Sequence, residues 1–303
     1  MTHAPVTGKL SYEQIEGKTN VTYSYATYPL KFIHPQGPIR RNYDAVLTYM
    51  LGYGGGLVSG DCVRIDCSIQ EKCSVVLCTQ ATTKVFRSKS AATSSKSIQI
   101  TSATIGQHAM LVFIPDPIAC FQGARFEQKQ AFRMTPSSSL IVVDWLISGR
   151  KRSFLSTGQV FSTREEHYEQ WAFELYDTRT EIYIDGEPLL IDHDEMISLK
   201  SQMATTHIIG YLIVVGPQFS SMTESLLQQH SRKQVSYSLQ RPMNQCEQTY
   251  TQPNVLTSAS PLGKCGVLLR FQGNDTESTM NHVKEQLKDL EHIVGFIPYQ
   301  EGR

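Results

Sequence analysis

Short β-type runs separated by turns make up most of the chain, and they limit what it can fold into more than any other feature. The runs are rich in Val, Ile, Thr, Tyr and Phe, which favour strands. Predicted strands cover 21–28, 43–49, 63–69, 74–79, 98–105, 110–114, 123–134, 140–146, 171–176, 180–184, 187–191, 207–215 and 266–271. Two neighbouring runs, 63–69 and 74–79, would form either a hairpin or two stacked strands. Asp185-Gly186 predicts a tight hairpin turn, because type I′ turns need positive φ.

Helical periodicity is confined to two segments. A capping-box pattern predicts a helix at 222–230. Near the C-terminus, apolar residues recur at spacings of three and four and predict one amphipathic helix, with the stripe Met280, Val283, Leu287, Leu290 and Val294. Asp275 or Thr276 suits its start and Gly295 its end. The predicted fold class is therefore mainly β, an extended stack or coil of many short strands with about two helices.

Composition narrows the class of protein. The 303 residues include 28 Lys and Arg against 28 Asp and Glu, so there is no surplus of positive charge for general nucleic-acid binding. No apolar run is long enough to predict a transmembrane helix, and no secretion leader is recognisable. The odd count of seven cysteines favours free thiols in a reducing compartment, so we expect a cytoplasmic protein. We predict one domain over 1–303, with a polar exposed loop at about 232–261.

Recognisable catalytic motifs are missing from the sequence. There is neither a G-x-S-x-G elbow nor an H-E-x-x-H helix, so we expect a protein that is not an enzyme. Gly55 and Gly60 have the spacing of a phosphate-binding loop, but Asp61 stands where that loop needs Lys, so these glycines are interpreted as turn residues. The cluster 192–195 (Asp-His-Asp-Glu), the segment 165–167 and the cysteines between 62 and 78 have metal-competent groups. For the two acidic segments the favoured interpretation is a solvated turn, and for the cysteines it is buried thiols that pack as small apolar side chains.

Two acidic residues lie inside strongly apolar runs. Asp144 interrupts Ile-Val-Val-Asp-Trp-Leu, and Glu174 interrupts Trp-Ala-Phe-Glu-Leu. A buried carboxylate is costly unless it is paired or hydrogen-bonded, and Arg150 is a candidate partner for Asp144. For each of these two carboxylates, one interpretation is a structural ion pair or an outward-facing position on a strand. The other is a place on a polar internal path or in an interface.

Five motifs, in order along nearly the whole chain, resemble those of the urease accessory proteins called UreD, or UreH in some organisms. They begin with a Gly-Gly-x-Val-x-Gly-Asp segment and a Thr-Gln-x-x-x-Lys-x-Phe-Arg segment. A Pro-Asp-Pro region, an Asp-Trp-x-x-Ser-Gly-Arg segment and Arg-Phe-Gln-Gly at 270–273 follow. The motif residues that we carry forward as structural or interface candidates are Gly55, Gly56, Gly60, Thr79, Gln80, Lys84, Arg87, Asp116, Arg125, Trp145 and Arg150.

The resemblance implies a scaffold or chaperone. A UreD-like protein would bind apo-urease and the accessory protein UreF, and through UreF the nickel-binding GTPase UreG, for nickel insertion into urease. It would hold no tightly bound cofactor, with nickel in transit along an internal, water-lined route. On that basis Asp61, Asp144 and Glu174 become candidates for the metal path, since oxygen ligands that bind weakly suit transit. Two alternatives stay open: a general protein-interaction module without a metal-delivery role, and a hydrolase or transferase on a β scaffold.

Overall fold

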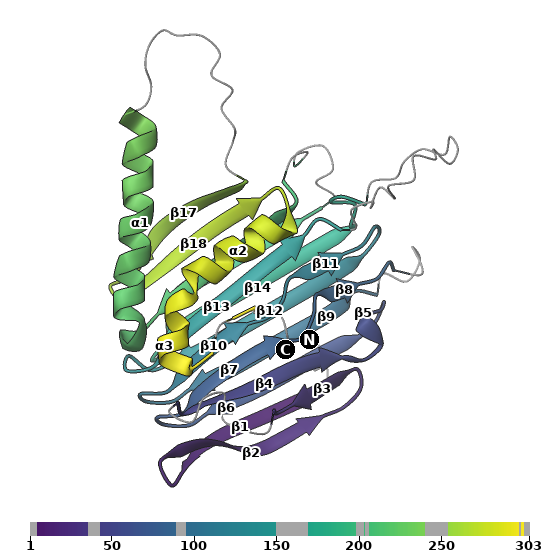
Figure 1. The fold of residues 1–303 in the computed structure, drawn as a ribbon. Helices are drawn as coiled ribbons and strands as arrows, with labels where there is room; N and C mark the ends of the chain where they lie inside the picture. Colours follow the sequence, from purple (N-terminus) through teal and green to yellow (C-terminus); the bar gives the residue numbers. More distant parts are fainter. Residues whose placement is uncertain are drawn as a thin grey trace, which may run out of the picture.

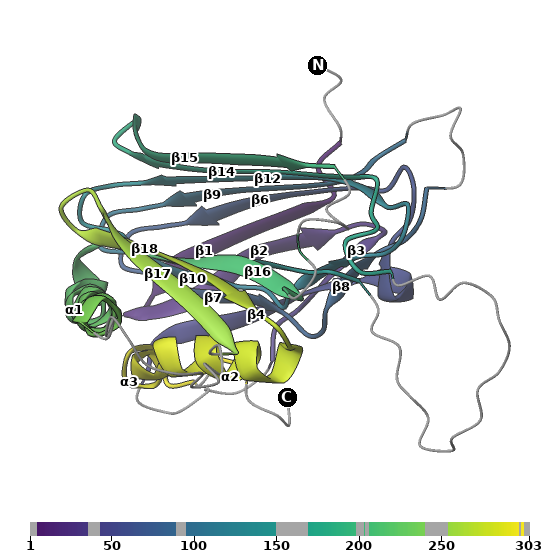
Figure 2. The same cartoon turned by 90° about the horizontal axis from the view of Figure 1, so that it is seen from above.

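Two stacked β-sheets, with helices over the outer face of one of them, form three layers (Figures 1 and 2). A computed structural model describes residues 5–35, 43–88, 95–149, 169–197, 203, 206–239, 254–296 and 298–299. Sheet A has the order β15 (Glu187–Met196), β14 (Leu175–Ile184), β12 (Arg125–Met134), β9 (Ser97–Ile105), β6 (Cys62–Ile69), β1 (Gly8–Ile15) and β2 (Lys18–Ala26).

Sheet B lies between sheet A and the helices. Its order is β17 (Val255–Leu262), β18 (Gly266–Gly273), β16 (Ile208–Val215), β13 (Ser139–Ile147), β10 (Met110–Ile114), β7 (Ser74–Thr79), β4 (Ala45–Gly52) and β3 (Leu30–Ile33). A short extension beside β13 contains β11 (Ile118–Cys120), β8 (Thr83–Val85) and β5 (Gly56–Leu57), the last of which follows the 3₁₀ turn η1 (Tyr53–Gly55).

The middle of the chain winds as a coil. From β6 to β14 the long strands alternate between the sheets: β6, β9, β12 and β14 lie in sheet A, and β7, β10 and β13 in sheet B with the short strands beside them. Successive strands within each sheet are parallel there, since every turn returns the chain in the same direction. The prediction of a mainly β coil with few helices is confirmed. Of the two alternatives for 63–69 and 74–79, the stacked pair is correct.

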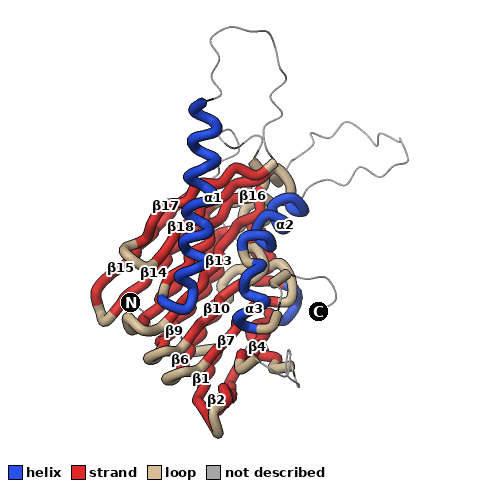
Figure 3. The backbone as a smooth tube through the Cα atoms, turned by 60° about the vertical axis from the view of Figure 1, so that its left-hand side comes forward, coloured by secondary structure: helices blue, strands red, loops and turns tan. Residues whose placement is uncertain are grey.

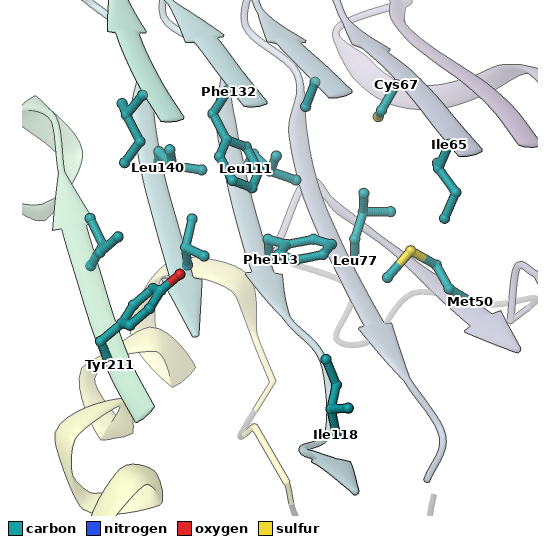
Figure 4. Packing of buried hydrophobic residues seen from close by; sticks show 14 of the residues in the cluster. Met50, Ile65, Cys67, Leu77, Leu111, Phe113, Ile118, Phe132, Leu140 and Tyr211 are labelled. Atoms are coloured by element: carbon teal, nitrogen blue, oxygen red, sulfur yellow. The ribbon is translucent and has the colours of Figure 1, made fainter. Parts of the chain in front are cut away.

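Two hydrophobic cores hold the layers together. One lies between the sheets, where alternate residues of facing strands meet, as Phe132, Leu111 and Leu140 do in Figure 4. The other lies between sheet B and the helices. Strand β13 contributes to both, so its whole length is buried, which explains its unbroken apolar run in the sequence.

The helices cover the side of sheet B that faces away from sheet A (Figure 3). After η2 (Pro217–Phe219), helix α1 spans Ser220–Leu239; α2 (Thr276–Gln286), η3 (Lys288–Leu290) and α3 (Glu291–Val294) follow β18. The Asp275 carboxylate caps α2 by accepting a hydrogen bond from the Ser278 amide at 2.7 Å, as predicted. Gly295 ends α3 in the left-handed conformation. No helix in the described part of the chain is long and apolar enough to cross a membrane.

Four sequence predictions need correction. The expected strand at 171–176 begins only at Leu175, and the single C-terminal helix is broken by η3. The predicted exposed loop at 232–261 is wrong at both ends, because α1 continues to Leu239 and β17 begins at Val255; residues 240–253 lie outside the described residues. No predicted strand corresponds to β1, β3, β5, β8, β11 or β17. The Asp185-Gly186 hairpin is confirmed, with φ of 50° and 86° at these two residues.

Candidate functional site: a polar corridor between the sheets

Polar side chains cross the inner face of sheet A in two rows, in a layer that is mostly apolar. Strand pairing places four residues side by side in each row, one each from β15, β14, β12 and β9. The first row is Asp194, Thr178, Gln128 and Gln99, and the second is Asp192, Thr180, Gln130 and Thr101. On β12 the two glutamines alternate with outward residues and share their face with Phe126 and Phe132, which belong to the intersheet core.

A third polar row faces them from sheet B. Its members are aligned by the antiparallel pairing of β17, β18, β16 and β13, and they are Ser258, Arg270, Tyr211 and Asp144. Figure 4 shows the Tyr211 hydroxyl extending into the intersheet space. The three rows together define what we call the polar corridor.

Asp144 joins the two sides of the corridor. Its Oδ2 accepts hydrogen bonds from Gln130 Nε2 at 2.6 Å, Gln128 Nε2 at 2.9 Å and the Tyr211 hydroxyl at 3.1 Å. Because Tyr211 donates its proton to Asp144, the Thr180 hydroxyl donates to the Tyr211 oxygen across 2.6 Å. Burial raises the pKa of Asp144 to about 6, and the hydrogen bonds from Tyr211, Gln128 and Gln130 limit that rise.

Unpaired acceptors surround this carboxylate. Gln128 Oε1, Gln130 Oε1 and Thr101 Oγ1 are buried without a hydrogen-bond partner, and these residues are at most 3% exposed. A buried oxygen without a donor is unfavourable, and a hydrated cation can supply what it lacks. Among the described residues there is no group of three His, Cys, Asp or Glu that could cage a metal. The described residues of the corridor thus offer separate oxygen atoms rather than a cage of His, Cys or carboxylate ligands.

A pocket opens at each end of the corridor. The mouth pocket, of about 400 Å³, is lined by Asp194, Thr178, Arg270, Tyr211 and Asp144, so it leads from the β15–β17 edges to the buried carboxylate. The far pocket, of about 640 Å³, contains Gln99 at the other end of the first row. Thr79 and Met50, which pair in sheet B, line it too, as do the motif residues Gly55, Gly56, Gln80 and Lys84.

The glycine motif shapes the wall of the far pocket. Gly55 and Gly60 have φ of 76° and 91°, as turn residues should. Gly56 pairs with β8, and a Cβ there would lie 2.3 Å from the Lys84 carbonyl oxygen. Asp61 accepts a hydrogen bond from the Val58 amide at 2.9 Å, so its carboxylate closes the turn.

The remaining motif residues also make local contacts. Thr79 donates to the Asp116 carboxylate at 2.9 Å and accepts from the Asp116 amide at 2.7 Å, which fixes the Pro-Asp-Pro bend beside the end of β7. Trp145 points toward the helices and donates its indole N–H to the Pro115 carbonyl at 3.0 Å. Gln80, Lys84 and Arg87 are exposed.

Glu174 lies at the surface, in an ion pair of the kind that was one of the alternatives for it. It precedes β14, is about half exposed, and forms an ion pair with Arg125 at 2.5 Å. Of the three predicted path residues, Asp144 alone lies within the corridor rows. Arg150, the candidate partner of Asp144, lies outside the described residues.

Sequence reasoning missed Gln128, Gln130, Thr180 and Tyr211. A signal for the glutamines was present, because Phe126-x-Gln128-x-Gln130-x-Phe132 puts two amides at the parity of two buried rings. Tyr211 gave no such signal, since aromatic residues are ordinary in buried strands.

The fold and the corridor together define a β-coil protein with rows of buried polar side chains between its sheets and a pocket at each end of them. The family described as "UreD urease accessory protein" matches residues 6–295, and the chain belongs to that family. Urease accessory protein D of Arabidopsis thaliana is 33% identical, with 97% of this chain and 99% of the relative aligned. The protein of the same name from Oryza sativa subsp. indica is 32% identical, and the alignment covers 98% of this chain and 96% of the relative. Urease accessory protein UreD of Anaeromyxobacter sp. is 27% identical, and the alignment covers 96% of this chain and 88% of the relative.

Proposed function

We propose that this chain is a non-enzymatic scaffold that acts in the cytoplasm, binding apo-urease and UreF, and through UreF the GTPase UreG. Nickel reaches the urease active site by way of the polar corridor. Membership of the urease accessory family supports the maturation role, and the corridor supports the part that nickel plays in it.

One observation carries the proposal: a buried carboxylate surrounded by unpaired amide oxygens, on a line of polar side chains between two pockets. Asp144 supplies the negative charge, and Gln128 and Gln130 supply neutral acceptors. A stable core would place apolar side chains here, because buried polar groups that lack partners destabilise it. Weak oxygen contacts would let an ion enter and leave, whereas a thiolate or imidazole cage would retain it.

Asp61 and Glu174 stay predicted path residues. Both lie outside the corridor rows and have partners of their own, so their role would be at the openings rather than in the interior. The exposed motif residues Gln80, Lys84 and Arg87 are proposed contacts for the partner proteins.

The test is urease activation by the full maturation complex carrying Asp144→Asn. Asparagine keeps the size and an acceptor for the three donors but removes the charge. We expect the complex to assemble and urease activity to fall at least tenfold at limiting nickel. Asp66→Asn is the matched control, because Asp66 lies on the outward face of β6, beside Arg64.

Full activation and full nickel content with Asp144→Asn would overturn the corridor as the nickel route. If the complex still assembled in that case, the alternative would gain support: an interaction module without a metal-delivery role.

A further inference from the structure

The far pocket has an apolar floor. Five of the residues that line it are at most 6% exposed and belong to the intersheet core: Leu30, Met50, Leu57, Val63 and Ile65. Met50 lies on β4 and Leu57 on β5, which belong to the main part of sheet B and to its short extension, so the pocket lies where sheet B divides. An apolar side chain that entered this space would be removed from water, which favours binding.

Lys84 stands at the rim of this floor. It is the one charged side chain among the described residues that line the far pocket. On β8 it precedes Val85, which belongs to the intersheet core, so Lys84 lies on the opposite, outer face and is exposed. No residue in the described part of the chain forms an ion pair with it. An unpaired cation beside an apolar floor is complementary to a carboxylate beside an apolar side chain.

Two exposed tyrosines adjoin the same pocket. Tyr28 and Tyr53 are 71% and 50% exposed, and their ring centroids are 6.0 Å apart. Their neighbours in sequence, Pro29 and Gly52, line the pocket, and the Tyr53 amide donates a hydrogen bond to the Pro29 carbonyl across 2.8 Å. Tyrosine is enriched at protein interfaces, because its ring buries a large area and its hydroxyl stays polar. The surroundings of the pocket therefore suit contact with another protein.

The two pockets differ in charge. The mouth pocket is lined by Asp144, Asp194 and Arg270, whereas the described residues that line the far pocket include no acidic side chain. A cation that left the corridor through the far pocket would meet no carboxylate of this lining. The protein that receives the ion would have to supply one there, and under the proposed function that protein is apo-urease.

We propose that the far pocket is a docking site for a segment of apo-urease that presents an apolar side chain next to a carboxylate. The apolar side chain covers the floor, the carboxylate pairs with Lys84, and the rings of Tyr28 and Tyr53 pack against the same segment. The inference rests on the proposed function, because it assigns a partner, and the chemistry of its contact, to one end of the same corridor.

The test measures binding of purified apo-urease to the full-length chain by biolayer interferometry, with UreF binding measured in parallel. Lys84→Glu reverses the charge at the rim, so we expect at least tenfold weaker binding of apo-urease. Ala81→Trp puts a large ring at an exposed position of the lining, so we expect a similar loss through obstruction. Both variants should bind UreF as the wild type does.

The matched control is Lys264→Glu. It makes the same charge change at an exposed lysine in the turn between β17 and β18, which lines neither pocket, so binding of both partners should be unchanged. Thermal melting verifies that each variant is folded.

Unchanged binding of apo-urease by both folded pocket variants would overturn the docking site. Loss of UreF binding with normal binding of apo-urease would assign the pocket to UreF and would equally overturn the proposal. The outcome is independent of the activation assay: if Asp144→Asn impairs activation while both pocket variants bind apo-urease normally, the corridor stands and the docking site fails. If both pocket variants lose apo-urease while Asp144→Asn activates normally, the docking site stands and the nickel route fails.

Discussion

Replacing Asp144 by asparagine should change how the stability of the protein depends on pH. Burial raises the pKa of this carboxyl to about 6 from an ordinary value of 3.8. When the pKa of an acid is higher in the folded than in the unfolded state, its protonated form stabilises the fold. This contribution to the free energy of unfolding is complete below the unfolded pKa and is lost as pH rises through the folded pKa. The difference between the two pKa values corresponds to about 3 kcal/mol.

The assay is urea unfolding of both proteins at a series of pH values, with the free energy of unfolding taken from the midpoint and slope. Between pH 4.5 and 8 we expect the wild-type value to fall by about 2 kcal/mol relative to Asp144→Asn. The comparison is made between two proteins that share every other titrating group, so those contributions cancel. Any fixed cost of fitting the amide cancels too, because it does not vary with pH.

A difference in unfolding free energy that stays constant over this range would refute the reasoning. It would mean that the carboxyl of Asp144 titrates alike in the folded and unfolded chain, and hence that water or a counter-charge reaches it. A difference that grows in the opposite direction would mean that the hydrogen bonds to Asp144 outweigh its burial.

Three other substitutions test the surroundings of the corridor. Gly56→Ala should lower the melting temperature by several degrees, because a Cβ would lie 2.3 Å from a carbonyl oxygen of β8. Gly52→Ala is the control and should melt like the wild type, because no atom lies within 4 Å of a Cβ there. Equal melting temperatures for the two variants would contradict the close approach at Gly56. Trp145→Phe should cost at least about 1 kcal/mol in urea unfolding, because it removes the hydrogen bond to Pro115 and part of a buried ring that packs on Phe271 and Tyr299. An unchanged value would show that these contacts together add no net stability. Glu174→Gln should change the free energy of unfolding by less than about 1 kcal/mol, because its ion pair with Arg125 is exposed. Reduced urease activation with normal melting would support Glu174 as a path residue. Normal activation would exclude Glu174 from the path.

Local pattern along the chain accounts for much of the fold. The alternation along β6, β9 and β12 identifies strands, and the unbroken apolar run of β13 identifies a strand buried on both faces. Turn chemistry at Asp185-Gly186 and the cap at Asp275 depend on neighbouring residues alone, which is why those predictions are confirmed. The end of α1 and the start of β17 were not predictable in this way: the polar composition there resembles a loop, but the helix continues to Leu239 and β17 pairs with β18 from Val255 onward.

The candidate site divides in the same way. The sequence by itself marked Asp144 as a carboxylate in an apolar run that would need partners. It did not say which partners, because the three donors lie 14, 16 and 67 residues away and are brought together by strand register and by the stacking of two sheets. Side-chain parity is a property of each strand, but alignment of polar residues across four strands depends on long-range pairing. The sequence therefore determined the strands, the turns and the family resemblance, and the tertiary structure alone decided that polar residues scattered along the chain form one corridor between two pockets.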